Sequence, residues 1–151
     1  AGESSFHRLL WDDAEVIKDG PIKLQKDAKI RRVVMCSGKV YYDLLEEREK
    51  RGIDDVYLLR LEQLYPFPAK ALINELSRFR NAEMVWCQEE PKNMGGWTFI
   101  DPYLEWVLAH IDAKYQRVRY TGRPAAASPA TGLMSKHLAQ LAAFLEDALG
   151  G

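Results

Sequence analysis

Short apolar runs alternate with amphipathic segments along most of the chain. The apolar runs, each of strand length, are residues 32–36, 55–61, 82–90 and 117–121. The segments with apolar residues at helical spacing are 39–51, 68–79, 101–113 and 133–149. Strand followed by helix, four times over, predicts an α/β fold. We expect three layers, with a mostly parallel Rossmann-like sheet between two layers of helices.

Glycine, aspartate and proline set the expected helix ends. Gly52 is placed to stop the helix that begins near residue 39. Asp101 and Pro102 predict the start of the third helix, because aspartate caps a helix and proline suits its first position. The core-facing stripe expected for the last helix is Met134, Leu138, Leu141 and Leu145.

Residues 1–29 do not continue this alternation. They mix isolated apolar residues with charged ones and carry a turn signal at Gly20 and Pro21. This pattern predicts an N-terminal arm or inter-domain linker, with the alternating domain covering residues 30–151. Large side chains are costly to leave in water, at roughly 1.5–3 kcal/mol each. The apolar cluster expected to dock on this domain or on a neighbour is Phe6, Leu9, Leu10 and Trp11.

The length and the net charge of the chain argue against some classes of function. The chain has 151 residues, the size of one domain, and a formal net charge of -1. That charge argues against nucleic-acid binding, which needs a basic face to neutralise phosphates. No apolar run approaches the roughly 18 residues that span a bilayer, so we expect no membrane partner. The first residue is not Met, and together with the linker-like arm this favours a piece of a longer protein.

The two cysteines, Cys36 and Cys87, each lie inside an apolar run. We expect buried thiols in a reducing compartment. A disulfide would require neighbouring strands and an oxidising compartment. Neither cysteine has a second cysteine or a histidine at metal-ligand spacing, so no zinc site is predicted.

Ligands of open α/β sheets bind beyond the carboxyl ends of the strands, where the strand order reverses. If the first and third predicted strands are neighbours, that crevice lies between residues 37–39 and 88–90. Gly38 and Lys39 form either a plain tight turn or an anion or effector site at a helix N-terminus. Glu89 and Glu90 are adjacent, so they point to opposite faces and are no general acid–base pair. Either could meet an arginine, cap a turn or reach across an interface.

The small-residue segment 122–132 carries Arg123, whose planar guanidinium could grip a carboxylate or phosphate. We expect either a rigid connection or subunit contact, or direct contact with a ligand. His7, His110 and His137 lie in the arm and in two predicted helices, and none is near a Ser or Cys nucleophile motif. No nucleophile–base pair, phosphate loop or metal-binding motif can be assembled, so no catalytic, cofactor-binding or metal-ligating residue is assigned.

Four strings resemble the C-terminal domain of 2-oxoglutarate dehydrogenases, in the family's order and at similar spacing. They are VVMCSGKVYYDL at 33–44, EQLYPFP at 62–68, WCQEEPKN at 86–93 and GRPAAASPATG at 122–132. The resemblance that they carry covers residue 31 to the end of the chain. The third string includes Asn93, which with Glu89 and Glu90 is a candidate for interface or loop support.

The resemblance implies a domain of a transketolase-like thiamine enzyme that works as a homodimer. Such enzymes decarboxylate 2-oxoglutarate in the tricarboxylic acid cycle and pass the succinyl group to the lipoyl group of the succinyltransferase component. It implies thiamine diphosphate and Mg²⁺ bound by upstream domains and no cofactor in this domain. The expected role is structural, completing the dimer, with an effector-binding regulatory role (acyl-CoA or nucleotide) as the alternative. The expected compartment is the bacterial cytoplasm, or the mitochondrial matrix in a eukaryote.

Overall fold

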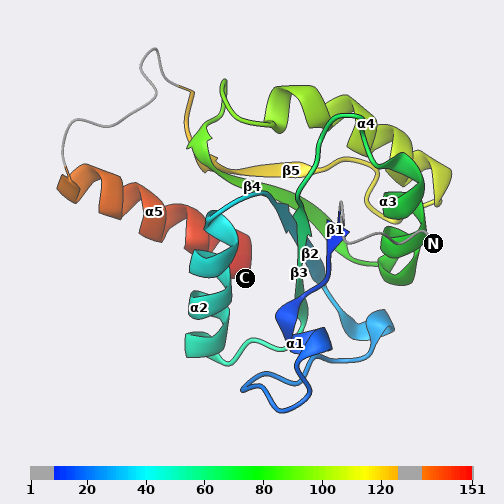
Figure 1. The fold of residues 1–151 in the computed structure, drawn as a ribbon, viewed down its shortest axis with the longest axis horizontal. Helices are drawn as coiled ribbons and strands as arrows, with labels where there is room; N and C mark the ends of the chain where they lie inside the picture. The colour runs from blue at the N-terminus through cyan, green and yellow to red at the C-terminus, as the bar shows by residue number, and fades with distance from the viewer. Residues whose placement is uncertain (1–8, 126–133, 151) are drawn as a thin grey trace.

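Five strands form one sheet among the residues that this computed structural model describes, 9–125 and 134–150. Their order is β1-β3-β2-β4-β5 (Figure 1). Their bounds are β1 Leu9–Leu10, β2 Arg32–Cys36, β3 Val56–Leu61, β4 Glu83–Pro91 and β5 Arg119–Arg123. The edge strand β1 is antiparallel to β3, and every other neighbouring pair is parallel. The predicted α/β fold with a mostly parallel sheet is therefore confirmed.

Helices cover both faces of the sheet, as the three-layer prediction requires (Figure 1). The α-helices are α1 Asp13–Val16, α2 Val40–Arg51, α3 Ala69–Leu76, α4 Trp97–His110 and α5 Met134–Leu149. Two short 3-10 helices are η1 Asp27–Lys29 and η2 Ser77–Phe79. Helices α3 and α4 pack on one face of the sheet, and α2 and α5 pack on the other.

Alternate residues of each central strand enter two separate cores, because side chains point to opposite faces along a strand. Met35 and Trp86 lie in the core beneath α3 and α4. Cys36 and Cys87 lie in the core beneath α2 and α5. Both are free and fully buried, as predicted, and they are register partners on neighbouring strands. Burial raises the pKa of both thiols, so both stay protonated and unreactive at neutral pH.

Helix α4 begins earlier than the sequence predicts. It starts at Trp97, so Pro102 lies inside the helix and not at its first position. The side chain of Gln88 accepts a hydrogen bond from the backbone N–H of Trp97 at 3.1 Å, which satisfies one of the free donors at the helix start. Trp97 and Ile100 also belong to the buried core. These long-range contacts outweigh the local signal of Asp101 and Pro102.

Only part of the stripe predicted for α5 is buried. Leu145 is buried, whereas Leu138 and Met134 are exposed. Figure 1 shows the first half of α5 extending past the end of the sheet, where the sheet offers it no surface. The apolar pattern therefore predicted the helix correctly but not the length of its buried face.

The described part of the N-terminal segment packs along the edge of the sheet. Leu9 pairs with Leu61 of β3 and also contacts the core beneath α3 and α4. Trp11 is exposed, and Phe6 and His7 lie outside the described residues. The segment thus docks on this domain through Leu9, while the boundary at residue 29 stays a prediction.

Candidate functional site

The position predicted for a crevice is the carboxyl ends of β2 and β4. These two strands are neighbours, and Cys36 of β2 is the register partner of Cys87 of β4. On its other side β2 pairs with β3, so the chain winds in opposite directions from this point. The structure therefore places the loop after Cys36 beside the end of β4, as the sequence predicts.

The turn at Gly38 leads into α2 on the β2 side of the crevice. Gly38 has φ +76° and is exposed, as is Lys39, which makes no side-chain hydrogen bond to the helix end. Asp43 follows in the first turn of α2. Burial, then the charge of Glu89, then that of Glu46 raise the pKa of Asp43 above its ordinary value. An anion entering here would gain from the helix N-terminus but would meet the field of these carboxylates.

Gln88 organises the loop that follows β4. Its amide nitrogen donates to the backbone oxygens of Pro91 at 2.8 Å and Met94 at 2.7 Å, and its amide oxygen accepts from the indole N–H of Trp86 at 2.8 Å. With the bond from Trp97, the amide is fully engaged, and the residue is buried. Sequence reasoning gave Gln88 no role of its own. The available signal was an amide at the end of an apolar run, directly before a loop with Pro and Gly.

Arg123 connects the ends of β4, β5 and α5. Only 4% of the residue is exposed. Its Nε donates to the backbone oxygen of Glu89 at 2.9 Å. One terminal nitrogen donates to the backbone oxygen of His137 at 3.2 Å and to Oε1 of Gln140 at 3.1 Å. The other lies 3.5 Å from Oε2 of Glu89 and 3.2 Å from Nε2 of His137.

Four of the five N–H groups of Arg123 thus face oxygen acceptors, and the fifth faces a ring nitrogen of His137, which accepts only when it carries no proton. The arrangement supports the rigid-connection interpretation of this residue. Contact with an effector, which would require Arg123 to release some of these partners, stays a prediction. The rest of the small-residue segment, residues 126–132, lies outside the described residues.

Glu90 lies near the end of β4, and Asn93 lies in the loop that follows it. Glu90 is exposed, and its backbone oxygen accepts from the amide of Gln88 at 3.1 Å. Asn93 is exposed in the loop between β4 and α4. Their predicted part in supporting an interface or loop stays a prediction. The same end of the sheet therefore carries Gly38, Lys39, Glu89 and Arg123, and α5 adds His137, which contacts Arg123.

A hollow of about 430 Å³ lies at the opposite end of the sheet, where Ile30 precedes β2 and Tyr57 is the second residue of β3. Its walls come mainly from the N-terminal segment. Arg78 stands in this hollow and forms ion pairs with Glu15 at 2.7 Å and Asp27 at 3.1 Å. These contacts fasten the segment to η2.

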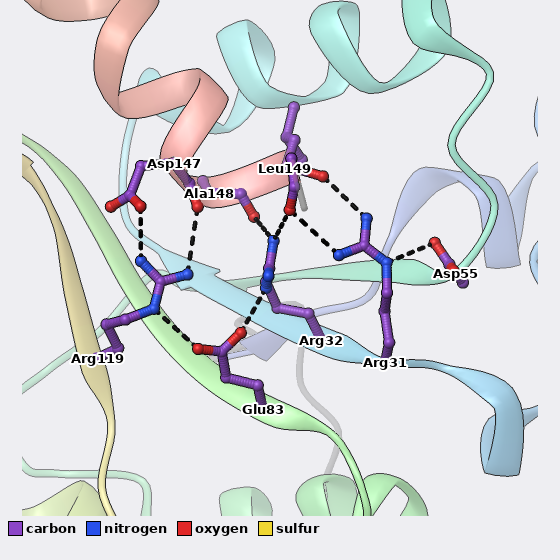
Figure 2. A network of polar contacts seen from close by, with 9 residues as sticks. Arg31, Arg32, Asp55, Glu83, Arg119, Asp147, Ala148 and Leu149 are labelled. Atoms are coloured by element: carbon purple, nitrogen blue, oxygen red, sulfur yellow. Dashed lines mark hydrogen bonds and ion pairs between the residues drawn. The ribbon is translucent and has the colours of Figure 1, made fainter.

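The C-terminal end of α5 is held by three arginines (Figure 2). Arg31 donates to the backbone oxygen of Leu149 at 3.0 Å, Arg32 to that of Ala148 at 2.9 Å, and Arg119 to that of Asp147 at 3.2 Å. These carbonyls have no partner within the helix and carry the negative end of its dipole, so cations stabilise them.

Glu83 joins two of these arginines (Figure 2). Its two oxygens accept from Arg32 at 2.7 Å and Arg119 at 2.8 Å. Burial alone would raise the pKa of Glu83, but the hydrogen bonds from Arg119 and Arg32 outweigh it and hold the pKa below its ordinary value. Polar side chains thus fix both ends of α5. Arg123 contacts its first half, and the three arginines of Figure 2 hold its C-terminal end.

The described residues contain no group of three or more His, Cys, Asp or Glu side chains that could hold a metal ion. In the same part of the chain, no helix has the length and apolar character needed to cross a membrane. Among the described residues, the side chains thus offer no carboxylate or histidine cluster for the Mg²⁺ that the resemblance assigns to the whole enzyme.

Comparison with known proteins identifies the family of this chain. The model of the family described as 2-oxoglutarate dehydrogenase C-terminal matches residues 1–149. The 2-oxoglutarate dehydrogenase E1 component of Brucella anthropi is 91% identical over 150 residues, which make up 99% of this chain and 15% of that protein. The E1 components of Brucella ovis and Brucella canis give the same values. The chain thus spans 15% of the length of these curated relatives.

Proposed function

Since the chain belongs to the 2-oxoglutarate dehydrogenase C-terminal family, we propose that it is a structural domain of a longer E1 polypeptide. Its task there is to complete the dimer and support the entrance to an active site formed elsewhere. The observation that carries this is the state of Arg123, at the end of β5. It is buried and engaged by protein acceptors, as a fixed connection requires.

For the whole polypeptide we propose the activity that the relatives' name states. The enzyme would decarboxylate 2-oxoglutarate oxidatively in the tricarboxylic acid cycle and pass the succinyl group to the lipoyl group of a succinyltransferase component. Upstream domains would hold thiamine diphosphate and Mg²⁺, which supply the carbanion-stabilising chemistry. In a bacterium this homodimer would work in the cytoplasm.

Three measurements test the proposal: activity, cofactor binding and the state of the dimer. The full-length polypeptide should decarboxylate 2-oxoglutarate, and calorimetry should detect its binding of thiamine diphosphate with Mg²⁺. The 151-residue chain should do neither, and micromolar binding of the cofactor to it would refute the proposal. For the dimer role, sedimentation should show that deleting residues 30–151 from the full-length polypeptide weakens the dimer. A deletion variant that remains dimeric and active would exclude that role.

A regulatory role is the second candidate. The exposed turn at Gly38 and Lys39 opens a helix whose N-terminus has no side-chain cap, which favours an anionic effector such as an acyl-CoA or nucleotide. The neighbouring carboxylates of Asp43 and Glu89 oppose it. A thermal-shift experiment on the full-length polypeptide with adenine nucleotides and acyl-CoAs separates the two roles. An unchanged melting temperature at millimolar ligand would count against the effector site.

A further inference from the structure

The outer face of α4 and the loop before α3 carry a continuous group of aromatic side chains. This group, called the aromatic face below, is Tyr65, Phe67, Phe99, Tyr103 and Trp106. The rings of Phe67 and Tyr103 stack with centroids 4.9 Å apart, those of Phe99 and Tyr103 are 5.1 Å apart, and those of Tyr65 and Phe99 are 6.4 Å apart. Trp106 lies one helical turn beyond Tyr103.

Much of the aromatic face is open to solvent in this chain. Tyr65 is 81% exposed, Trp106 49% and Tyr103 44%. Scattered apolar residues on a surface are ordinary, but contiguous ones mark an interaction surface. Tyrosine, tryptophan and phenylalanine are also the side chains enriched at protein interfaces.

The two helical layers differ in the surface they present. The exposed positions of α2 include Glu46, Glu49 and Lys50, as a solvated helix requires. Helix α4 has charges only at Asp101 and Glu105 besides the terminal His110. Its exposed positions beyond the aromatic face are Thr98, Pro102, Ala109 and His110. Helix α4 therefore has the composition of a covered surface, whereas the charged positions of α2 are those of a solvated one.

The path of the chain indicates what covers it. Leu9 pairs with Leu61, the last residue of β3, so the N-terminal segment reaches the sheet at the carboxyl end of that strand. Tyr65 follows only four residues after Leu61, within a reach of about 14 Å. Leu9 and Phe67 also pack against the same core, on the α4 side of the sheet. The described part of the N-terminal segment therefore starts on the same side of the sheet as the aromatic face.

The length of the relatives indicates how much polypeptide precedes this domain. This chain accounts for 15% of each of them, and the matching family is described as C-terminal. A tethered upstream domain has an effective concentration in the millimolar range, which an untethered copy of the domain does not have. We propose that the aromatic face docks on an uncharged, apolar surface of the upstream part of the same polypeptide. This inference rests on the proposed function, because it requires the longer chain.

Site-specific photo-cross-linking in the full-length polypeptide tests the proposal. Replacing Tyr103 or Trp106 with p-benzoylphenylalanine keeps an aromatic ring at an exposed position, so folding should be retained. The control is the same replacement at Glu49, on the charged side of α2. After irradiation, peptide mass spectrometry should join residue 103 or 106 to residues upstream of Ala1, with a yield at least five-fold above that at residue 49. On a denaturing gel the product should keep the mass of one chain.

Three outcomes would overturn the proposal: yields at residues 103 and 106 no higher than at residue 49, products joining two copies of this domain, or products joining only another protein. Activity on 2-oxoglutarate is measured on the same variants. An active enzyme without upstream cross-links would refute the docking surface alone. An inactive polypeptide with upstream cross-links would refute the proposed activity and leave the docking surface standing.

Discussion

Asp12 and Arg48 form an ion pair in which neither side chain is exposed to solvent. Both terminal nitrogens of Arg48 donate to the carboxylate, one of them at 2.7 Å. The same carboxylate accepts from the backbone N–H of Leu58 at 2.7 Å and from that of Ala14 at 2.8 Å. One side chain thus joins the N-terminal segment to α2 and β3.

Replacing Asp12 with alanine should therefore destabilise the chain severely. The substitution leaves the charge of Arg48 buried without its partner, which costs about 3–5 kcal/mol. Urea denaturation should show a fall of that size in the free energy of unfolding. The control is Asp13→Ala, which removes a partly exposed carboxylate 3.7 Å from Arg60 and should cost about 1 kcal/mol or less. Equal effects of the two substitutions would contradict the role assigned to Asp12.

Alanine substitution at Gly38 and at Gly122 should lower the free energy of unfolding by different amounts. A Cβ at Gly122 would lie 2.5 Å from the backbone oxygen of Gln88, at a φ of +151°. At Gly38, with φ +76°, a Cβ would meet nothing within 4 Å. We expect Gly38→Ala to cost about 1–2 kcal/mol from backbone strain alone, and Gly122→Ala roughly 3–5 kcal/mol from strain and overlap together. Urea midpoints that rank them in the reverse order would show that β5 can shift away from β4.

The stability should depend on pH through Glu83. Its pKa is lower in the folded chain than its ordinary value of 4.5, despite burial, because Arg119 and Arg32 donate to it. Such a carboxyl contributes stability above the pKa of the unfolded chain, and that contribution is lost as the pH falls through the folded pKa. Glu83→Gln should lower the free energy of unfolding at pH 7 by about 1 kcal/mol, since solvent screens this partly exposed group.

Urea titrations of both proteins should show this difference shrinking as the pH is lowered through and below 4.5. Glu47→Gln, which changes a surface pair with Arg51, serves as the control. It should alter the free energy of unfolding little, both at pH 7 and below pH 4.5. A difference between Glu83→Gln and the parent chain that stays constant with pH would argue that packing, not charge, explains the effect.

Arg123 and Arg119 should slow amide hydrogen exchange at opposite ends of α5. Arg123→Met removes the contacts to His137 and Gln140, whose loss should open the first half of the helix. A hydrogen bond to a charged group contributes about 1.5–3 kcal/mol, so amide exchange at residues 138–142 should rise by at least about tenfold. Arg119→Met should instead raise exchange near Asp147. Exchange mass spectrometry that finds both substitutions acting on the same end would refute this division.

The sequence predicted those features that depend on neighbours along the chain. Apolar runs such as 32–36 lie close to the observed β2, and the helical spacing of 133–149 matches α5 Met134–Leu149. The reason is that strand and helix each bury a face with a fixed period. The order of these elements was enough for the α/β fold, and four short strings were enough for the family that the comparisons now support.

Contacts between distant residues were decided only by the tertiary structure. Nothing local pairs Asp12 with Arg48, 36 positions away, or directs Arg123 to His137 and Gln140. Even the start of α4 depended on Gln88, nine residues before Trp97. Charged and amide side chains have many partners of similar strength available along a chain. Which partner each one takes is fixed only when the packed sheet and helices exclude water from the pair.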